Sequence, residues 1–435
     1  MKKNPSITLA ILFVLLNSCQ CKNDQLPDNY TIKLSNVYGG TKIDYATCIV
    51  KSGDGSYVIA GSTNSKNGDV VGGKEGQASA WILKLHSNGN ILWQKTLGYG
   101  FAISHVASVI VTLDKACILV GTTDRQPVDA RGMHEGTNAY IVKIDSSGNI
   151  LSKQILRGSS NDWASSVTLT SDGGYIMAGS KSSQPWIVKF DSRDEIQWEK
   201  TCRAGSNGYG HAVSIMATDD KGYIMAGNTT TDNKGNLDGP HGVNDAWIAK
   251  LDSSGTMLWH RILGGSSSDY ATSVTIGSDG SFILAGRTSS NDGDVRGNHG
   301  LWDAWVLKLN IDGEIVWQKT VGGLKSDYAN AVVKAAAGGA IIGGYTTIKD
   351  GILTGRGDTD AWIVELDSSG NTVWQRTFGG SGNDEARSII EESDRKYVIV
   401  GLTNSNDGDV SGNRGEYDAW VVKVQNERKV LGIKR

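Results

Sequence analysis

The chain has 435 residues, of which 39% are hydrophobic and 20% are charged, and its formal net charge is −3 at pH 7. Because 43 basic residues are balanced by 46 acidic ones and no Lys/Arg cluster interrupts the repeats described below, nucleic acid is not expected as a partner. The 56 Gly, 13 Trp and 14 Tyr, against only 5 Pro, are typical of a turn-rich all-β protein with aromatic packing.

The first residues have the features of an export signal. A basic start, Met1–Lys3, precedes an apolar run, Ile7–Leu16, that is too short to span a bilayer comfortably. Leu16 stands three residues before Cys19, and the small residue Ser18 comes directly before that cysteine. This pattern resembles a bacterial lipobox, in which the chain is cleaved at the cysteine and lipid is attached to it.

The lipobox resemblance implies a boundary and a location. Residues 1–18 are expected to be a lipoprotein signal peptide, Cys19 the lipidation site and residues 19–29 a tether. Several acyl chains on one cysteine would anchor the protein firmly, since a single chain binds only marginally. The expected location is therefore the bacterial cell envelope, at the outer membrane. An ordinary secretory signal is the alternative, and Cys21 is a second candidate for lipidation.

Residues 30–425 are expected to form one module repeated seven times. In each copy a glycine ends an Ala-Gly-like dipeptide within an apolar run, and these glycines are spaced 60, 58, 48, 59, 58 and 57 residues apart. They are Gly61, Gly121, Gly179, Gly227, Gly286, Gly344 and Gly401. Self-similarity at such a period indicates a repeat architecture.

Each module reads as four strands. The copy at residues 266–297 contains two alternating apolar runs joined by an Asp-centred turn, which is the signal of a β-hairpin. A second hairpin follows at residues 303–323, again turned on Asp-Gly. Helical periodicity is absent, and four antiparallel strands per repeat fit a propeller blade. The sequence therefore predicts an all-β, seven-bladed β-propeller.

The two ends of the repeat region predict how the ring closes. Tyr30–Val37 precedes a Gly-Gly pair as the fourth strand of a module does, yet no first three strands precede it. The last module supplies three strands ending near residue 424, whereas the tail, residues 426–435, lacks the usual Trp. We therefore expect the N-terminal strand to complete the last blade and remove its open edge.

Several recurring motifs carry a family resemblance. The modules contain G-G-x-x-x-D-x-A, then A-G-x-T-x-S, then D-A-W-x-x-K-L-D-x-x-G-x-x-x-W. This pattern resembles the bacterial β-propeller repeats often called SBBP repeats, which occur in secreted and surface proteins and share no common activity. Asp252–Trp259 shows a weaker likeness to the tryptophan-docking motif of quinoprotein-type propellers. Eleven of the 13 Trp occupy two repeated strand positions, which predicts packing between blades.

A second set of aromatic residues is expected to surround the central channel. In each module the innermost strand is expected to start fifteen positions before the repeat glycine, and one residue stands just before that start. These seven residues, which we call the mouth residues, are Tyr45, His105, Trp163, His211, Tyr270, Tyr328 and Glu385. An Asp precedes most of them. An aromatic ring with an acidic collar could bind a sugar or a peptide; alternatively the aromatics plug the channel and the Asp residues cap backbone N–H groups.

Blade three differs from the other six. Only Gly179–Trp186 separates its repeat glycine from its third-strand aromatic, whereas the other intervals run 18 to 20 residues. The missing loop predicts a notch beside Trp163, in which Asp162, His105 and His211 would hydrogen-bond a ligand. Tyr45, Tyr270 and Tyr328 are further candidate ligand-binding residues. His134 and His241 are expected on the flanking loops. Loss of the loop without a functional consequence is the alternative.

Loops on the same face carry closely spaced aspartates, as in N-D-G-D-V-x-G. The candidate metal ligands are Asp292, Asp294, Asp303, Asp407, Asp409 and Asp418. Carboxylate oxygens suit a hard cation such as Ca²⁺, although Asp-Gly also simply makes a tight turn. We expect the turn role, with Ca²⁺ as the alternative, and no other cofactor.

The sequence favours a binding module over an enzyme. It contains no G-x-S-x-G elbow, and the repeated aspartates are too alike to single out a catalytic pair. We expect a lipid-anchored, non-catalytic binding or scaffold propeller whose partner is a protein, peptide or glycan. The rival hypothesis is a glycan-active enzyme that uses carboxylates at the channel mouth, Asp162 or Asp269, as acid or base.

Overall fold

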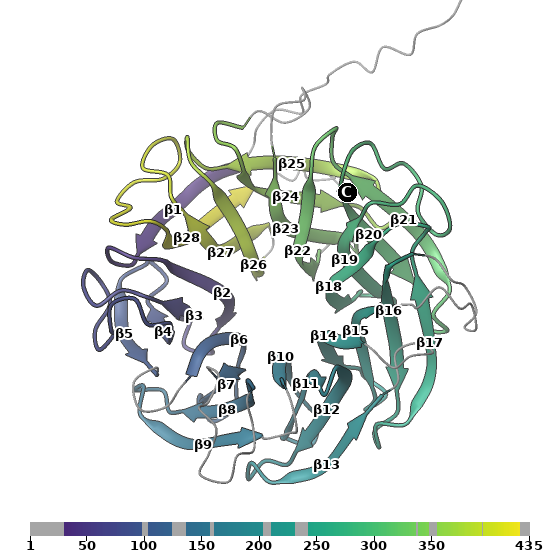
Figure 1. Ribbon diagram of the computed structural model, residues 1–435, viewed down its shortest axis with the longest axis horizontal. Coiled ribbons are helices and arrows are strands. Elements are labelled where there is room, and N and C mark those ends of the chain that lie inside the picture. The colour runs from purple at the N-terminus through teal and green to yellow at the C-terminus, as the bar shows by residue number, and fades with distance from the viewer. Residues whose placement is uncertain are drawn as a thin grey trace, which may run out of the picture.

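The computed structural model describes residues 30–97, 103–123, 136–156, 161–202, 210–230, 242–335, 338–347, 355–393 and 395–426. These residues form 28 strands in seven four-stranded antiparallel sheets. The sheets stand as blades around a central axis, with no helix among the described residues (Figure 1). The predicted seven-bladed β-propeller is therefore confirmed.

The strands follow the chain from the innermost to the outermost position of each blade. Blades one to four contain β2 (Asp44–Lys51), β3 (Tyr57–Thr63), β4 (Ser79–Leu85), β5 (Ile91–Thr96); β6 (Ile103–Val111), β7 (Cys117–Thr123), β8 (Ala139–Ile144), β9 (Ile150–Leu156); β10 (Trp163–Leu169), β11 (Tyr175–Lys181), β12 (Gln184–Phe190), β13 (Ile196–Thr201); and β14 (Gly210–Ala217), β15 (Tyr223–Thr230), β16 (Asn244–Leu251), β17 (Met257–Leu263). Blades five to seven contain β18 (Asp269–Ile276), β19 (Phe282–Thr288), β20 (Asp303–Leu309), β21 (Ile315–Val321); β22 (Asp327–Lys334), β23 (Ala340–Thr346), β24 (Asp360–Leu366), β25 (Thr372–Phe378); and β26 (Asp384–Ser393), β27 (Lys396–Thr403), β28 (Asp418–Asn426), β1 (Tyr30–Tyr38).

The ring closes through its first strand, as the sequence predicts. β1 pairs with β28 in the order β1-β28-β27-β26, from Tyr30 opposite Asn426 to Tyr38 opposite Ala419. The Tyr30 ring stacks on Trp374 of blade six, with 3.7 Å between ring centroids. The N-terminal strand therefore both completes blade seven and ties it to its neighbour.

The hydrophobic core lies between the blades. Each of the seven clusters of buried residues combines side chains from two consecutive blades. The third-strand tryptophans belong to these layers and are at most 4% exposed: Trp81, Trp186, Trp247, Trp305, Trp362 and Trp420. Because both faces of the middle strands are buried, these strands read as continuous apolar runs, and the predicted packing between blades is confirmed.

The fourth-strand tryptophans reach across to the next blade. Trp198 of β13 lies against Gly255 in the turn between β16 and β17, and Trp317 lies against Gly370 in the same way. Both glycines have positive φ, +77° and +83°, which L side chains rarely adopt. The Asp-Gly-type turns are therefore both a sharp reversal and a docking surface for the indole of the preceding blade.

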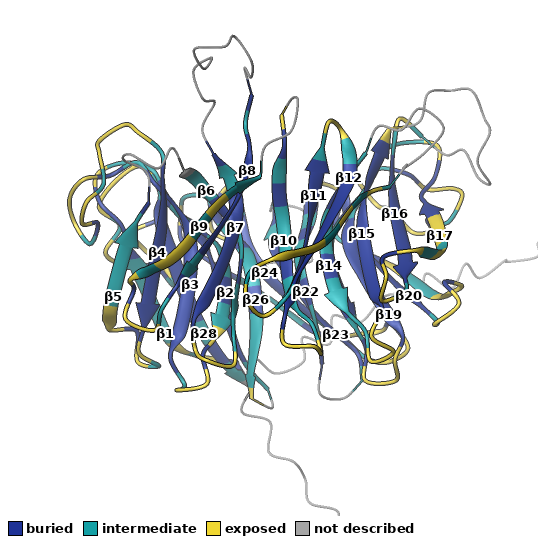
Figure 2. Ribbon diagram, turned by 90° about the horizontal axis from the view of Figure 1, so that it is seen from below, coloured by how far each residue is buried: buried dark blue, intermediate teal, exposed yellow. Residues whose placement is uncertain are grey.

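The two ends of the ring differ. Pairing of Asp44 with Thr63, and of Thr63 with Ser79, brings the start of an innermost strand and the second-to-third-strand loop to the same end, which we call the loop face. Tyr30 and Asn426 pair at the opposite end, the turn face. Figure 2 shows the ring from the side, with buried residues in the middle strands and exposed residues mainly in the turns at the two ends and on the outer strands. The part of the chain that the structure describes contains no helix long and apolar enough to cross a membrane.

Candidate functional site

The repeat glycines position the mouth residues. A Cβ atom at each of the seven glycines would overlap the carbonyl oxygen of the mouth residue in the paired innermost strand, as Gly179 would overlap that of Trp163. Directly after each contact the strand pairing shifts by one residue, for example between Ala164 and Ser166. The glycine therefore permits a bulge that sets the direction of the mouth side chain.

The mouth residues lie near the starts of the innermost strands, as the sequence predicts, and are half-buried. The Oη of Tyr45 lies 3.4 Å from Nδ1 of His105, and the guanidinium of Arg387 lies 4.7 Å from the centroid of the Tyr45 ring. Arg387 also pairs with Glu385 at 3.3 Å. Blades seven, one and two thus contribute a connected polar and aromatic group to the mouth.

The aspartates before the mouth residues do not form an exposed acidic collar. Those at Asp44, Asp162, Asp269, Asp327 and Asp384 are at most 2% exposed. Asp269 accepts hydrogen bonds from the Gly265 N–H at 2.7 Å, from Ser290 Oγ at 2.8 Å and from Thr288 Oγ1. The capping alternative therefore describes these carboxylates, and burial raises the pKa of Asp269.

The short interval of blade three is a two-residue hairpin. β11 ends at Lys181 and β12 begins at Gln184, so that only Ser182 and Ser183 form the turn, with φ of 52° and 61°. Two consecutive left-handed residues are typical of a type I′ turn, whose twist matches that of the strands. Asp162 Oδ1 accepts the Ser182 N–H at 2.9 Å. The predicted missing loop is confirmed, and Asp162 lies buried beneath the turn.

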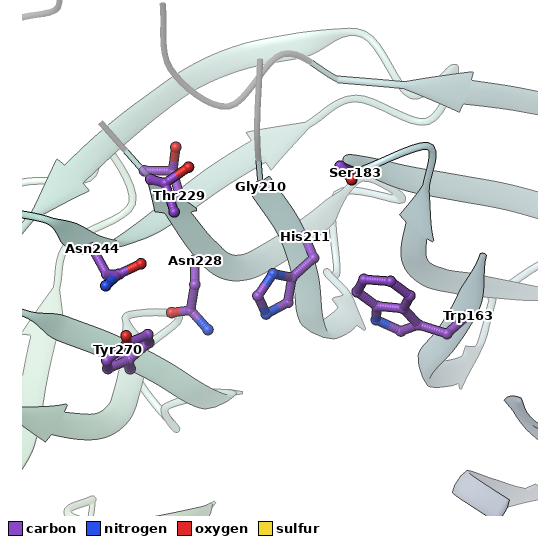
Figure 3. A pocket seen from close by; sticks show the side chains of 9 residues that line it. Trp163, Ser183, Gly210, His211, Asn228, Thr229, Asn244 and Tyr270 are labelled. Atoms are coloured by element: carbon purple, nitrogen blue, oxygen red, sulfur yellow. The ribbon is translucent and has the colours of Figure 1, made fainter. Parts of the chain in front are cut away.

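A pocket opens beside this turn, between blades three, four and five. Its volume is about 280 Å³, and it is lined by Trp163, Ser183, Gly210, His211, Asn228, Thr229, Thr230, Asn244 and Tyr270. The Trp163 and His211 rings lie 5.9 Å apart. Figure 3 shows the His211 imidazole with Trp163 on one side and Asn228 and Tyr270 on the other. The structure thus brings three of the predicted ligand-binding residues together in the predicted notch.

The pocket lining is aromatic and neutral. Burial lowers the pKa of His211, so its imidazole is neutral at pH 7. Asn228 bridges to blade five: its Oδ1 accepts the Ala271 N–H at 2.7 Å and its Nδ2 donates to the Ala271 carbonyl at 3.0 Å. Nδ2 of Asn244 lies 3.4 Å from Oγ of Ser268. Side-chain amides and hydroxyls beside ring faces suit a ligand that has both C–H surface and hydroxyl or amide groups.

Other predicted residues lie elsewhere. His105 packs on Tyr45 and does not line the pocket; burial, with a contribution from Arg387, lowers its pKa to about 4. Tyr328 stacks on Tyr345 at 4.5 Å in blade six. Asp162 bonds to the turn at Ser182 and does not line the pocket. His134, His241 and Cys19 lie outside the described residues.

The loop aspartates hold the loops to the linker from the preceding blade or to the loop's own backbone. Asp292 accepts the Ser266 N–H at 2.7 Å, and Asp303 accepts both the N–H and the Nδ1 of His299 at 3.0 Å. Asp294 accepts the Gly264 N–H at 3.2 Å. In blade seven the equivalent residues Asp407, Asp409 and Asp418 accept the N–H groups of Ser381, Gly379 and Arg414. Among the described residues, no three acidic, His or Cys side chains gather as a potential metal site.

Sequence reasoning missed close carboxylate pairs between blades. A Cβ at Gly264 would lie 2.5 Å from Oδ2 of Asp269 and 2.9 Å from Oδ1 of Asp245, so the two carboxylates face the same glycine. Desolvation, then the charges of Asp269 and Asp294, raise the pKa of Asp245 to about 7. Desolvation, opposed by backbone N–H groups, raises that of Asp360 to about 6 beside Asp384. The Gly-Gly pair that precedes the innermost strand in blades one, five, six and seven was the signal that a backbone passes between two acids.

It also missed the second-strand side chains at the mouth. The residue after each repeat glycine pairs directly with the mouth residue, and Arg287, Tyr345 and Asn228 occupy this position. Their proximity to the mouth residues could have been predicted, because each stands one position after a repeat glycine. The carboxylates on which catalysis would depend, Asp162 and Asp269, are buried and accept hydrogen bonds from the Ser182 N–H and from Thr288 Oγ1.

Comparison with known proteins supports the fold. No known family model matches the chain. Regulatory protein FlaEY of Caulobacter vibrioides is 28% identical over 205 residues, covering 43% of this chain and 21% of that protein. An uncharacterised WD repeat-containing protein of Acanthamoeba polyphaga mimivirus is 19% identical over 434 residues, covering 74% of this chain and 31% of that protein. The chain thus spans about a fifth and about a third of these relatives.

One solved structure aligns over most of the ring. The WD40 domain of Neurospora crassa Pan2 matches with a TM-score of 0.53 and 11% identity, covering 92% of this chain and 96% of that one. This similarity shows the propeller fold alone. The chain is thus a β-propeller, and membership of the SBBP-type repeats stays a prediction.

Proposed function

We propose that this propeller is a non-catalytic binding module and that its ligand occupies the pocket at Trp163, His211 and Tyr270. One observation carries the proposal: the two-residue turn Ser182–Ser183 replaces a long loop at a place where a pocket of about 280 Å³ opens beside mouth aromatics. The missing loop of blade three and the aromatic rings of the pocket are therefore found at the same place. This volume is near the lower limit for small-molecule sites, about 300 Å³, and suits a sugar ring or a short peptide segment.

The anchor would orient this site. The lipoprotein reading of Cys19 rests on the sequence pattern, and Tyr30, the first described residue, lies on the turn face. A tether that begins there leaves the loop face and its pocket directed away from the bilayer. The proposed location is the bacterial cell envelope, at the outer membrane, with the partner outside the membrane. Fractionation of cells that express Cys19→Ala tests this: unchanged membrane attachment and mature size would contradict it.

The binding proposal is tested with a matched pair of aromatic variants. Trp163→Ala removes a ring that lines the pocket, and Tyr45→Ala removes a mouth ring in blade one that does not. Partners are recovered from envelope extract and from a glycan array, and affinities are measured by calorimetry. Loss of a central aromatic contact weakens binding by about 1–3 kcal/mol, so Trp163→Ala should show this loss and Tyr45→Ala should not. Equal affinities, or equal losses, would move the site away from blade three.

A further inference from the structure

Arg287 is the mouth cation whose surroundings indicate a function. It lies on β19 directly opposite Tyr270 and is partly exposed. Its guanidinium carbon is 4.8 Å from the Tyr270 ring centroid, 5.0 Å from that of Tyr328 and 5.4 Å from that of Trp302. Three aromatic faces, from two blades and a loop, thus hold one guanidinium.

The ring faces attract the charge but supply no hydrogen-bond acceptor in the plane of the guanidinium. Within the described residues, the Nε–H of Arg287 is buried and has no hydrogen-bond partner, and the ion pairs found there do not include this side chain. A guanidinium carries five donors in a fork that matches a planar anion. Aromatic contacts that fix its orientation while leaving its donors unused are those of a preorganised anion site.

Arg387 provides the contrast in the same mouth. It too lies over a mouth ring, 4.7 Å from the centroid of Tyr45, but it pairs with the carboxylate of Glu385 at 3.3 Å. Its charge is therefore compensated by the protein, whereas that of Arg287 is not compensated by any described ion pair. Of these two guanidinium groups, Arg287 is the one that an incoming anion can satisfy.

The position of Arg287 connects it to the pocket. Tyr270 lines the pocket and also carries Arg287 against its ring. Asn228, which lines the pocket, occupies in blade four the repeat position that Arg287 occupies in blade five. A ligand in the pocket that extends along the mouth past Tyr270 therefore next meets this guanidinium.

We propose that Arg287 binds an anionic group of the ligand and that the ligand is an acidic carbohydrate. This inference rests on the proposed binding function. Described pocket residues contribute ring faces, hydroxyls and amides and no aliphatic side chain, which suits the C–H faces and hydroxyls of a sugar better than the apolar side chains of a peptide. The anionic group is a carboxylate or a sulfate, both of which match the donor fork.

The test uses an array of carboxylated, sulfated and neutral oligosaccharides, with the methyl ester of each carboxylated one, and an acidic peptide. The protein is compared with Arg287→Gln and with Arg387→Gln, the matched control. We expect binding to an acidic oligosaccharide that Arg287→Gln weakens by about tenfold or more, as for loss of a charge-assisted hydrogen bond, and that Arg387→Gln changes little. Esterification should reproduce the Arg287→Gln loss, while a preference for the sulfated oligosaccharides would identify sulfate as the group.

The outcomes separate this inference from the binding proposal. Neutral oligosaccharides bound as well as acidic ones, with no effect of Arg287→Gln, would overturn the inference; if Trp163→Ala still weakens that binding, the pocket stands. Binding of the acidic peptide alone would overturn the carbohydrate class. Thermal melting and Arg287→Lys, which keeps the charge but not the fork, control for folding: a correctly folded Arg287→Lys that binds at full strength would show that the planar donors are not used.

Discussion

The contact between Trp198 and the turn at Gly255 offers a direct test of how blades three and four, which flank the pocket, are held together. We expect Gly255→Ala to destabilise the protein more than Gly280→Ala. The two glycines have nearly equal φ, +77° and +78°, and each donates its N–H to the residue three positions earlier. A Cβ at Gly255 would lie 2.5 Å and 2.7 Å from Cη2 and Cζ3 of Trp198, whereas a Cβ at Gly280 would meet no atom within 4 Å.

The magnitudes follow from this difference. A left-handed alanine costs about 1–2 kcal/mol, and both variants share that cost. Only Gly255→Ala must also displace the indole, and overpacking of this kind costs about 1–3 kcal/mol more. We therefore expect losses of about 1–2 kcal/mol for Gly280→Ala and about 2–5 kcal/mol for Gly255→Ala.

Urea unfolding followed by circular dichroism measures both variants, with the midpoint compared at equal slope. A second readout is ligand affinity, which Gly255→Ala should lower if the contact between the two blades keeps the pocket in shape. Equal midpoints for the two variants would refute the reasoning, because the glycine would then be required by its φ alone and not by the indole of the neighbouring blade.

Three further predictions concern charge, closure and cations. The pKa of Asp245, raised to about 7 in the folded state, means that the stabilisation by its protonated form is complete below pH 4 and is lost as the pH rises through 7; Asp245→Asn should unfold less readily than the wild type at pH 8, and an unchanged pH profile would contradict this. Deletion of residues 22–37 removes most of β1 and should lower the melting temperature or cause aggregation, while deletion of residues 22–28 should not; a monomeric protein with unchanged melting would show that β1 is dispensable. If the loops with Asp292 and Asp407 bind Ca²⁺, millimolar Ca²⁺ should raise the melting temperature relative to chelator, and no shift would leave these residues with their turn contacts alone.

Much of the architecture was predictable because the repeat is regular. The spacing of Gly61 and its six equivalents gives the number of blades, and the same offset locates the mouth residues, since one blade geometry recurs seven times. The short interval between Gly179 and Trp186 predicted the notch, because so few residues between two paired strands leave room for a tight turn and not for a long loop. These inferences needed only distances along the chain.

The chemistry of the site was less predictable because it depends on contacts between blades. Whether Asp162 faces a ligand or a turn depends on the backbone of Ser182, twenty residues further on. The environment of Arg287 is set by Tyr328 and Trp302, whose proximity arises only when the blades are placed side by side. The repeat period predicts which positions lie between two blades. The contacts made there depend on side chains that differ from blade to blade.

The pairing of β1 with β28 has a consequence for biosynthesis. Among the described strands, the first to be made forms its sheet with the last, so the seventh sheet cannot assemble until β28 has been made, and nearly 400 residues separate the partners in sequence. During that interval both edges are available to other chains, which is when a β-rich protein is prone to aggregate. A ribosome that stops before Asp418 therefore releases a product with intact early blades but no means of joining its ends, and this open arc would be an efficient substrate for quality-control proteases.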